Sequence, residues 1–376
     1  MAGIYFHIPF CKQACHYCDF HFSTSLKYRK EMLDAMEKEI SLQARYVSSA
    51  AIESIYFGGG TPSLLEADDI SRLIDAIAHH FDIQTDAEIT IEANPDDLDD
   101  LMVMALKGTP INRFSIGIQS FFEEDLRWMN RAHNAVEAQD AIRRVQDNGY
   151  HNITADLIYG YPLLTDRKWH QNIDRLLDFG IPHVSAYGMT VEPQTALAAF
   201  IRKGKQSPMD EGQSATQFEY LMEKLTAAGY EQYEISNFAK PGHYAHHNSS
   251  YWKGIPYLGI GPSAHSFDGN TRQWNVRNNA KYIQAIQTGT VPYEREELTE
   301  RDRLNEYIMT SLRTIWGLDL EYVEQHFNAT YSESLYSELQ PFISRGEVSL
   351  VDQVVTLTNR GKLLADRIAS ELFLSD

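Results

Sequence analysis

The pattern of hydrophobic positions alternates between two periods through the N-terminal part of the chain. Short runs rich in β-branched and aromatic residues predict strands, and the stretches between them place apolar residues every three or four positions, which predicts helices. Six strands are predicted, at Ile4–Ile8, Ser54–Phe57, Glu88–Glu92, Arg113–Ile118, Ile153–Ile158 and His183–Met189. The helical pattern begins with Leu33, Met36, Ile40 and Val47 and recurs at Asp68–His80, Ala135–Asn148, Lys168–Asp178 and Gly212–Ala228.

This regular alternation of strand and helix predicts an α/β fold. Consecutive strand–helix–strand units form parallel sheets with right-handed crossovers. Six units are too few to close the eight-stranded TIM barrel. We therefore predict an open six-unit (β/α) partial barrel, with functional residues at the C-terminal ends of its strands and an open side that admits a large substrate.

The element pattern changes in the last part of the chain. Helices are predicted at Arg301–Ile315 and Leu320–Phe327, followed by a hairpin that turns at Asp352-Gln353 and by a final helix capped at Thr358 or Asn359. Helices followed by a hairpin predict a small winged-helix-like α+β domain. We divide the chain into a core at 1–235, a middle segment at 236–298 and a C-terminal domain at 299–376. The middle segment is rich in Gly, Asn, His, Tyr and Trp, which favours ordered loops that complete the functional site.

The charge of the chain argues against nucleic acid as a partner. The formal net charge is −19, and residues 300–376 alone carry 13 acidic and seven basic residues. Nucleic-acid binding depends on Lys and Arg neutralising phosphates, and such a basic surface is not expected here. The C-terminal domain is therefore interpreted as a lid or buttress.

The composition predicts a cytoplasmic protein without direct membrane insertion. No apolar run approaches the ~18 residues of a membrane span. The first residues lack the basic segment and the cleavage site of a signal peptide. Thiols stay reduced in the cytoplasm.

The three cysteines give the most specific chemical signal. Cys11, Cys15 and Cys18 form Cys-x3-Cys-x2-Cys. Three thiolates can hold three irons of a [4Fe–4S] cluster and leave the fourth iron open. S-adenosylmethionine (SAM) can fill that position through its amino and carboxylate groups, and electron transfer then gives a 5′-deoxyadenosyl radical. The spacing resembles the radical SAM superfamily.

Zinc is the alternative that the cysteines leave open. A structural zinc site takes four Cys or His ligands, and His7, His16 or His21 could supply the fourth. A disulfide is less consistent with the sequence, because three cysteines leave one unpaired.

Polar and glycine residues near the ends of the predicted strands suit a nucleoside ligand. Gly58-Gly59-Gly60-Thr61-Pro62 follows the second strand, and glycines let a backbone approach a ligand closely. Such a turn can hold the amino-acid end of SAM, and Glu92 can accept hydrogen bonds from ribose hydroxyls. Gln119, Arg131 and Asp156 follow at the next strand ends. Each of these residues taken alone also fits an ordinary turn or surface ion pair.

Nearly the full length of the chain resembles the oxygen-independent coproporphyrinogen III dehydrogenase family of radical SAM proteins. The resemblance rests on the segments 5–11, 58–62, 117–119, 129–131 and 156–162 and on the C-terminal domain. It implies that Cys11, Cys15 and Cys18 bind the cluster. It also implies a SAM site of Tyr5, Gly59, Gly60, Thr61, Glu92, Gln119, Arg131, Asp156 and Gly188.

The chain departs from the true dehydrogenases of that family in two ways, and it resembles the heme chaperone branch instead. The true dehydrogenases have a fourth cysteine where this chain has Phe20, and a longer segment before the motif. His247-Asn248-Ser249-Ser250-Tyr251-Trp252 matches the His-Asn-x-x-Tyr-Trp signature of the branch. His247 offers an axial iron ligand, and Tyr251 and Trp252 offer flat faces to a porphyrin. His243, His246 and His265 are reserve ligands.

The resemblance implies two functions from different classes. As a heme chaperone, the protein would bind heme and pass it to an acceptor protein, a membrane-bound respiratory enzyme among the candidates. The cluster and SAM would then serve stability, regulation or formation of a homodimer. As a dehydrogenase, it would decarboxylate coproporphyrinogen III oxidatively to protoporphyrinogen IX.

Overall fold

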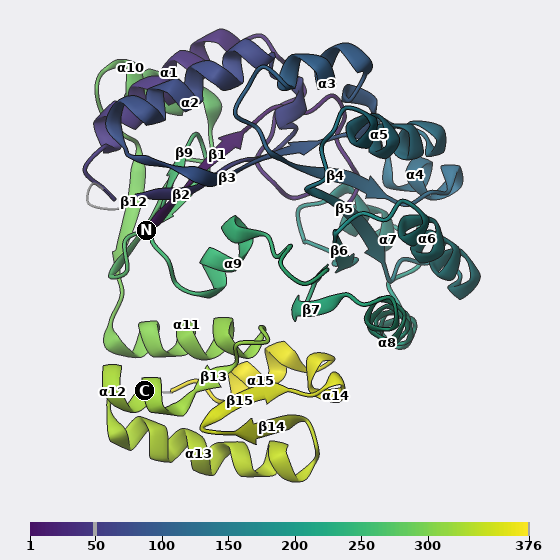
Figure 1. Ribbon diagram of the computed structural model, residues 1–376, viewed down its shortest axis with the longest axis vertical. Coiled ribbons are helices and arrows are strands. Elements are labelled where there is room, and N and C mark those ends of the chain that lie inside the picture. Colours follow the sequence, from purple (N-terminus) through teal and green to yellow (C-terminus); the bar gives the residue numbers. More distant parts are fainter. Residues whose placement is uncertain (48–50, 375–376) are drawn as a thin grey trace.

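The computed structural model describes residues 1–47 and 51–374. A curved sheet with helices on its outer face forms the larger part, and a smaller domain lies below it (Figure 1). The six predicted strands are confirmed, and they pair in parallel in chain order. They are β1 (Ala2–Ile8), β2 (Ile52–Gly59), β3 (Ile83–Ala93), β4 (Arg113–Gln119), β5 (Ile153–Tyr159) and β6 (His183–Gly188).

The alternation of side chains along these strands separates the core from the barrel interior. Successive residues of a strand point to opposite faces of the sheet. In β1, Ile4 and Phe6 are fully buried, and the Phe6 ring stacks on Phe57 of β2 with 4.7 Å between centroids. Tyr5, between them, lines the cavity inside the barrel. The strand therefore supplies both the core and the site.

The helices cover the outer face of the sheet, and the five predicted ones are present. The first ends at Gln43, so Val47 lies beyond it although it is buried. The prediction missed three helices of seven residues each, which are too short to show a period. The bounds are α1 (Arg29–Gln43), α2 (Ala67–His80), α3 (Asp100–Leu106), α4 (Glu123–Met129), α5 (Ala135–Asp147), α6 (Asp166–Asp178), α7 (Ala196–Arg202) and α8 (Glu211–Ala227).

Short strands extend the sheet on both sides of the six-stranded core, where the sequence predicted ordered loops. β9 pairs in parallel with β1, and β10, β11 and β12 continue antiparallel, while β8 and β7 follow β6. These strands have three to five residues, too few for a clear alternation. The elements are β7 (Glu231–Glu234), β8 (Asn237–Ala239), α9 (His246–Trp252), β9 (Tyr257–Ile260), β10 (His265–Phe267), β11 (Thr271–Asn275), α10 (Asn279–Gln287) and β12 (Tyr293–Glu297).

The C-terminal part forms a second hydrophobic core around a three-stranded sheet. The hairpin is confirmed: Asp352 and Gln353 have φ of 48° and 66°, the conformation of a tight two-residue turn. Thr358 caps the next helix as predicted, but the single final helix that was predicted is divided into α14 and α15, and α13 was not predicted. The elements are α11 (Glu300–Leu312), β13 (Leu318–Asp319), α12 (Leu320–His326), α13 (Ala329–Ser344), β14 (Val348–Val351), β15 (Val354–Leu357), α14 (Asn359–Lys362) and α15 (Ala365–Glu371).

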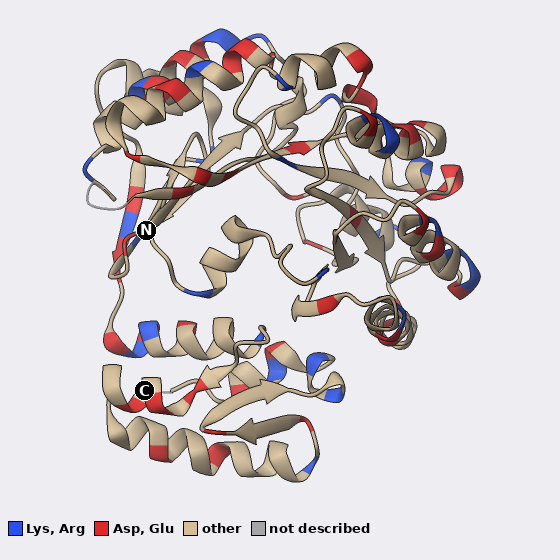
Figure 2. Ribbon diagram, in the orientation of Figure 1, with Lys and Arg blue, Asp and Glu red and all other residues tan. Residues whose placement is uncertain are grey.

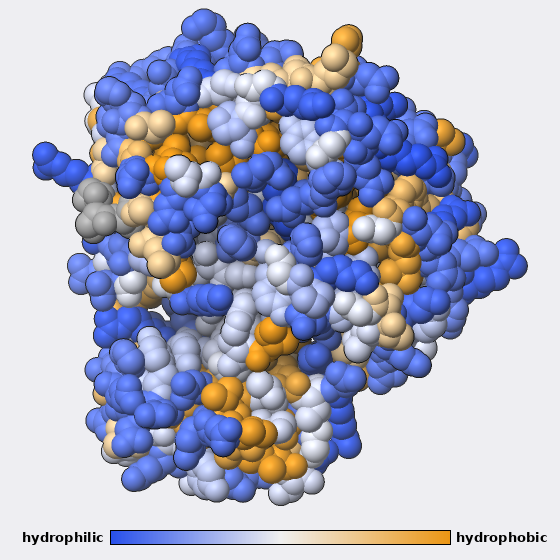
Figure 3. All heavy atoms as spheres, in the orientation of Figure 1, coloured by the Kyte–Doolittle hydropathy of each residue, from blue (hydrophilic) through white to orange (hydrophobic). Residues whose placement is uncertain are grey.

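The C-terminal domain contacts the barrel through β7 and the end of α9. The backbones of Glu234 and Thr314 form an isolated antiparallel β-bridge. The Lys253 ammonium lies 4.0 Å from the centre of the Trp316 ring. Charged residues are spread over the outer helices of the barrel (Figure 2). One face is mainly hydrophilic, with hydrophobic patches over both parts (Figure 3).

Across residues 1–47 and 51–374, no helix has the length and hydrophobicity to cross a membrane.

Candidate functional site

A cavity of about 560 Å³ occupies the interior of the partial barrel. It extends from the loop after β1 to α9, and residues from all six parallel strands line it. Among the residues predicted for the cluster, SAM and heme, those absent from its lining are Trp252 and the reserve histidines His243, His246 and His265. The structure therefore brings together Tyr5, Cys11, Cys15, Cys18, Gly59, Gly60, Thr61, Glu92, Gln119, Arg131, Asp156, Gly188, His247 and Tyr251.

The cysteines lie in the loop that leaves the C-terminal end of β1. Cys11 is buried at 9% exposure, and Cys15 and Cys18 are half-buried. Burial raises the pKa of Cys11 to about 11 and that of Cys18 to about 12. Thiols bind metal as thiolates, so these groups need positive charge from bound metal to ionise.

The donor set fits a cluster held by three thiolates. Each thiolate of a [4Fe–4S] cluster binds its own iron, so the sulfurs surround the cube and need not converge on one ion. Within the described residues, no three His, Cys, Asp or Glu side chains converge as ligands of a single metal ion. The histidines of the zinc alternative hydrogen-bond to protein groups: His7 to the His21 carbonyl, His16 to the Trp128 carbonyl, and His21 to Asn279.

The glycine turn after β2 packs closely against the first strand and its loop. Gly59 has a φ of 102°, and a Cβ built there would lie 2.6 Å from the His7 ring. A Cβ on Gly60 would lie 2.5 Å from the Phe10 carbonyl oxygen. Only glycine fits so close an approach, which brings the turn next to the cysteine loop.

Glu92 and Asp156 place two carboxyl groups in the cavity. Glu92 accepts hydrogen bonds from the Tyr56 hydroxyl at 2.8 Å and from the Gly59 N–H at 3.1 Å. Burial raises the pKa of Glu92 to about 7 and that of Asp156 to about 6. Both groups therefore change charge near neutral pH and can accept hydrogen bonds from hydroxyls when ionised.

Arg131 enters the cavity after a sharp turn at the end of α4. Asn130 closes that helix in the left-handed conformation, with φ of 58°. The Arg131 guanidinium then donates to Asn94 Oδ1 at 2.6 Å and to Cys15 Sγ at 3.5 Å. Its Nε is buried and has no hydrogen-bond partner among the residues that the structure describes. A buried unpaired donor on a cation suits a carboxylate ligand, as in the amino-acid end of SAM.

The remaining residues of the predicted SAM site surround this centre. Gln119 ends β4 with φ of 63°, a strained conformation for a residue other than glycine. Thr61 accepts from Asn94 Nδ2 at 3.3 Å, and Gly188 ends β6. The Tyr5 hydroxyl lies 3.2 Å from His7 Nδ1.

His247 lies at the opposite end of the cavity, on α9, and is 3% exposed. Its Nδ1 lies 2.8 Å from Ser54 Oγ, and its Nε2 lies 2.8 Å from the Tyr251 hydroxyl. Its ring stacks against those of Tyr5 and Tyr56. Burial lowers the pKa of His247 to about 3, so the imidazole is neutral, the form that binds iron.

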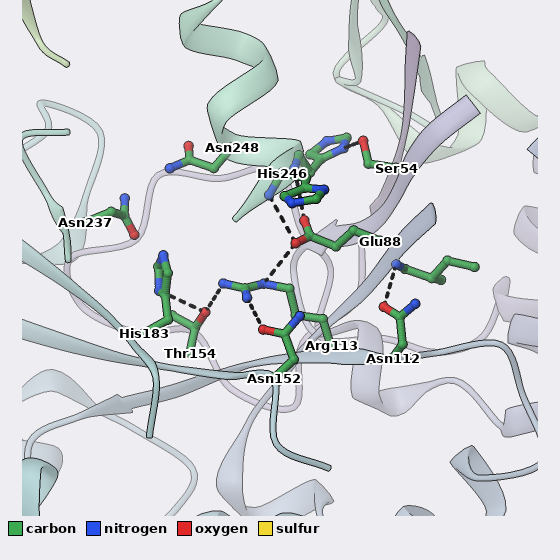
Figure 4. Close-up of polar contacts among 12 residues, drawn as sticks. Ser54, Glu88, Asn112, Arg113, Asn152, Thr154, His183, Asn237, His246 and Asn248 are labelled. Atoms are coloured by element: carbon green, nitrogen blue, oxygen red, sulfur yellow. Dashed lines mark hydrogen bonds and ion pairs between the residues drawn. The ribbon is translucent and has the colours of Figure 1, made fainter. Parts of the chain in front are cut away.

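A buried polar network that the sequence analysis missed holds α9 in place (Figure 4). Glu88 accepts from the backbone N–H groups of His246 and His247, at 3.0 and 2.9 Å. Arg113 pairs with Glu88 at 3.8 Å and donates to Thr154 at 2.5 Å. The sequence carries only a weak signal of this network. Ser54, Tyr56 and Gly58 occupy alternate positions on one face of β2, Arg113 is the first residue of β4, and Thr154 is the second residue of β5.

The other residues of the predicted heme site have different surroundings. Trp252 lies under the Arg313 guanidinium, 5.4 Å from ring centre to guanidinium carbon, at the contact with the C-terminal domain. His243, His246 and His265 are exposed and do not line the cavity. Of the four histidines, only His247 faces it.

Comparison with known proteins gives consistent matches over nearly the full length. Residues 5–191 match the model of the radical SAM superfamily, and residues 298–364 match that of the HemN C-terminal domain. "Heme chaperone HemW" of Bacillus subtilis strain 168 is 32% identical, with 98% of both chains covered. "Heme chaperone HemW" of Escherichia coli strain K12 is 30% identical, with 100% of this chain and 98% of the relative covered.

The fold also matches a solved enzyme. The structure of coproporphyrinogen III oxidase (HemN) from Escherichia coli, described as a radical SAM enzyme, superposes with a TM-score of 0.85 at 25% identity. The match covers 99% of this chain and 90% of that one. The predicted partial barrel with its C-terminal domain is therefore confirmed.

Proposed function

The chain belongs to the radical SAM superfamily and, within it, to the family of HemW heme chaperones, and on this premise we propose that it binds heme and transfers it to an acceptor protein. One observation carries the proposal beyond the family. His247, in the signature that the sequence shares with this branch, is a neutral histidine facing the cavity that the cysteines also line.

Cys11, Cys15 and Cys18 would hold a [4Fe–4S] cluster in this proposal. Arg131, through its unpaired Nε, would bind the SAM carboxylate, and Glu92 would accept the ribose hydroxyls. Tyr5, Gly59, Gly60, Thr61, Gln119, Asp156 and Gly188 would complete the SAM site. When bound, the cluster supplies single electrons and SAM supplies a cleavable C–S bond.

His247 would ligate the heme iron, and Tyr251, which lines the same cavity, would contact the porphyrin. Trp252, predicted for the same site, lies outside this cavity under Arg313 and would not contact a porphyrin bound there. A neutral imidazole binds iron through a nitrogen lone pair. The stacked rings of Tyr5 and Tyr56 keep this part of the cavity apolar around the imidazole. Because both His247 nitrogens are hydrogen-bonded, binding requires one of these bonds to break.

The proposal extends to partners and location. The heme acceptor would be another protein, with membrane-bound respiratory enzymes as candidates, and the chaperone itself would work in the cytoplasm and form a homodimer. The net charge of −19 supports the absence of nucleic acid from this set. We propose residues 1–235, 236–298 and 299–376 as the functional division of the chain.

Coproporphyrinogen III dehydrogenase activity is the second candidate, favoured by the close match of the fold to HemN. Phe20 weighs against it, because it replaces the fourth cysteine expected in the dehydrogenases. Anaerobic incubation of cluster-loaded protein with SAM, a strong reductant and coproporphyrinogen III separates the two. Protoporphyrinogen formed over many turnovers would replace the chaperone proposal.

Titration of the full chain with ferric heme tests the chaperone proposal directly. The wild type should bind heme and pass it to apo-proteins of heme enzymes, and His247→Ala should lose the binding while keeping the cluster. His246→Ala, with an exposed imidazole on the same helix, is the matched control and should bind normally. Equal heme affinity of His247→Ala and wild type would refute the assigned ligand.

A further inference from the structure

We propose that Ser54 and Tyr251 set the ligand state of His247: Ser54 holds the imidazole through Nδ1, while the Tyr251 hydroxyl occupies the position at Nε2 that heme iron would take. This inference rests on the proposed heme site. It adds a positioning residue and gives Tyr251 a second role, as a competitor of iron.

The two hydrogen bonds of His247 differ in how readily they can be exchanged. Ser54 is 2% exposed and lies on β2, between β1 and β3 in the middle of the sheet. Tyr251 is half-buried, lies one turn after His247 on α9, and lines the cavity. Because Tyr251 lines the cavity, a turn of its side chain would break its bond to Nε2, whereas the Ser54 hydroxyl is held on a buried central strand. Nε2 is therefore the nitrogen that can be freed for iron.

The start of α9 is anchored so that His247 cannot simply turn away from Ser54. Glu88 accepts the backbone N–H groups of His246 and His247, and Arg113 lies beside Glu88 (Figure 4). Glycine at position 3 leaves room for the imidazole, because a Cβ there would lie 3.3 Å from its ring and 3.1 Å from Ser54 Oγ.

This arrangement has the form of an outer-shell contact to a metal ligand. A histidine that binds metal through one nitrogen usually donates its other N–H to a fixed acceptor, which sets the tautomer and the ring orientation. Ser54 Oγ is such an acceptor for Nδ1–H. The Tyr251 hydroxyl then donates to the Nε2 lone pair, and heme binding must break that bond before iron can coordinate.

The proposal predicts opposite effects for the two hydroxyls. Ser54→Ala should weaken heme binding by about 10- to 100-fold, the usual cost of removing an outer-shell partner. Tyr251→Phe should strengthen it by about 2- to 10-fold, because the competing hydrogen bond is gone while the aromatic face remains. A purely structural role of the two residues would weaken binding in both variants.

The experiment is an anaerobic titration of full-length protein with ferric heme, followed by absorption and electron paramagnetic resonance spectra. Ser249→Ala is the matched control for Ser54→Ala. Ser249 lies on α9 beside His247, and its buried hydroxyl has no hydrogen-bond partner within residues 1–47 and 51–374. Tyr257→Phe is the control for Tyr251→Phe, since the Tyr257 ring packs edge-on against Tyr251 at 4.6 Å. Both controls should bind heme with wild-type affinity. Ser54→Thr retains the hydroxyl and should restore the wild-type spectrum.

A measurement without heme keeps the inference testable if a variant binds weakly for other reasons. Nitrogen-15 NMR of histidine-labelled protein should show His247 as the Nδ1–H tautomer, and Ser54→Ala should shift the population towards Nε2–H. Loss of heme binding in His247→Ala together with unchanged affinity in Ser54→Ala and Tyr251→Phe would overturn this inference and leave the proposed function intact. Failure of the wild type to bind heme would overturn both.

Discussion

The two ends of the barrel cavity are built in opposite ways. At the mouth, where the strands end, the cysteine loop carries three thiols without disulfide partners, and Phe20 is 64% exposed. Arg131 Nε is buried there with no hydrogen-bond partner in the described part of the chain. At the floor, around α9, His247 is 3% exposed with both ring nitrogens hydrogen-bonded. Glu88 and Arg113 are buried there as an ion pair.

The difference separates a site prepared for ligands from one that is closed. Unpaired polar groups at the mouth cost stability and gain partners when a ligand arrives. At the floor His247 and Glu88 have their hydrogen bonds already, so a ligand of His247 must replace an existing contact. We infer that changes at the mouth alter cofactor binding with little effect on folding, and that changes at the floor alter folding as well.

Removing the cysteines should have the largest effect on cofactor content. Replacement of Cys11, Cys15 and Cys18 by Ala should eliminate bound iron and sulfide completely, because the cluster depends on thiolate ligands. Iron and sulfide analysis with absorption spectroscopy measures this. His247→Ala should keep its full iron content, since the floor is at the other end of the cavity. Iron and sulfide retained in the triple variant would disprove the cluster assignment.

Breaking the ion pair of the floor should have the largest effect on stability. Glu88→Ala leaves the buried Arg113 charge unpaired and removes the acceptor of two α9 N–H groups, which should cost about 3–5 kcal/mol of unfolding free energy. Urea denaturation measures it. Glu371→Ala, which breaks a surface pair with Arg367, should change stability by less than about 1 kcal/mol. Equal losses in the two variants would contradict the distinction between floor and surface.

Removing the cation of the mouth should reduce SAM affinity more than stability. Arg131→Ala deletes a charged donor, which should weaken SAM binding by about 10- to 100-fold in calorimetric titrations. Arg127→Ala is a suitable control, because that side chain is 78% exposed and lies on α4, four positions before Arg131. If both variants bind SAM as tightly as the wild type, Arg131 is not the carboxylate partner.

The pH dependence of SAM affinity should show the smallest effect. Burial raises the pKa of Glu92 to about 7. Below that pH Glu92 is protonated and loses acceptor capacity for the ribose hydroxyls, so affinity should rise between pH 6 and pH 8, by roughly three- to tenfold. Glu92→Gln should bind more weakly and with a flatter profile. A wild-type profile as flat as that of Glu92→Gln would remove Glu92 from the ribose site.

The residues at the mouth are easier to predict from the sequence than those at the floor. Cys11, Cys15 and Cys18 lie within eight positions, and Glu92 and Gln119 lie at ends of parallel strands that must meet at one edge of the sheet. Strand periodicity and spacing are therefore sufficient to place them. The same periodicity predicted the six-stranded core and the C-terminal hairpin.

The floor depends on pairs that no local pattern reveals. Ser54 and His247 are 193 positions apart, and Glu88 and His247 are 159 apart. The helix that carries His247 has seven residues, and the strands on either side of it, β8 and β9, have three and four, so neither a helical nor a strand period was visible. A polar residue at the start of a strand can face solvent or a buried helix end, and only the tertiary packing decides.

The two edge strands of the large sheet, β12 and β7, affect whether two molecules of this protein can pair through their sheets. An unprotected strand edge invites pairing with another chain and leads to aggregation. β12 presents five exposed residues, four of them charged, so its edge repels a neighbouring strand. At the other side, Glu234 of β7 bridges to Thr314 of the C-terminal domain, which covers part of that edge. At this edge the small domain takes the place of a further strand, which limits the pairing of β7 with a strand of another molecule.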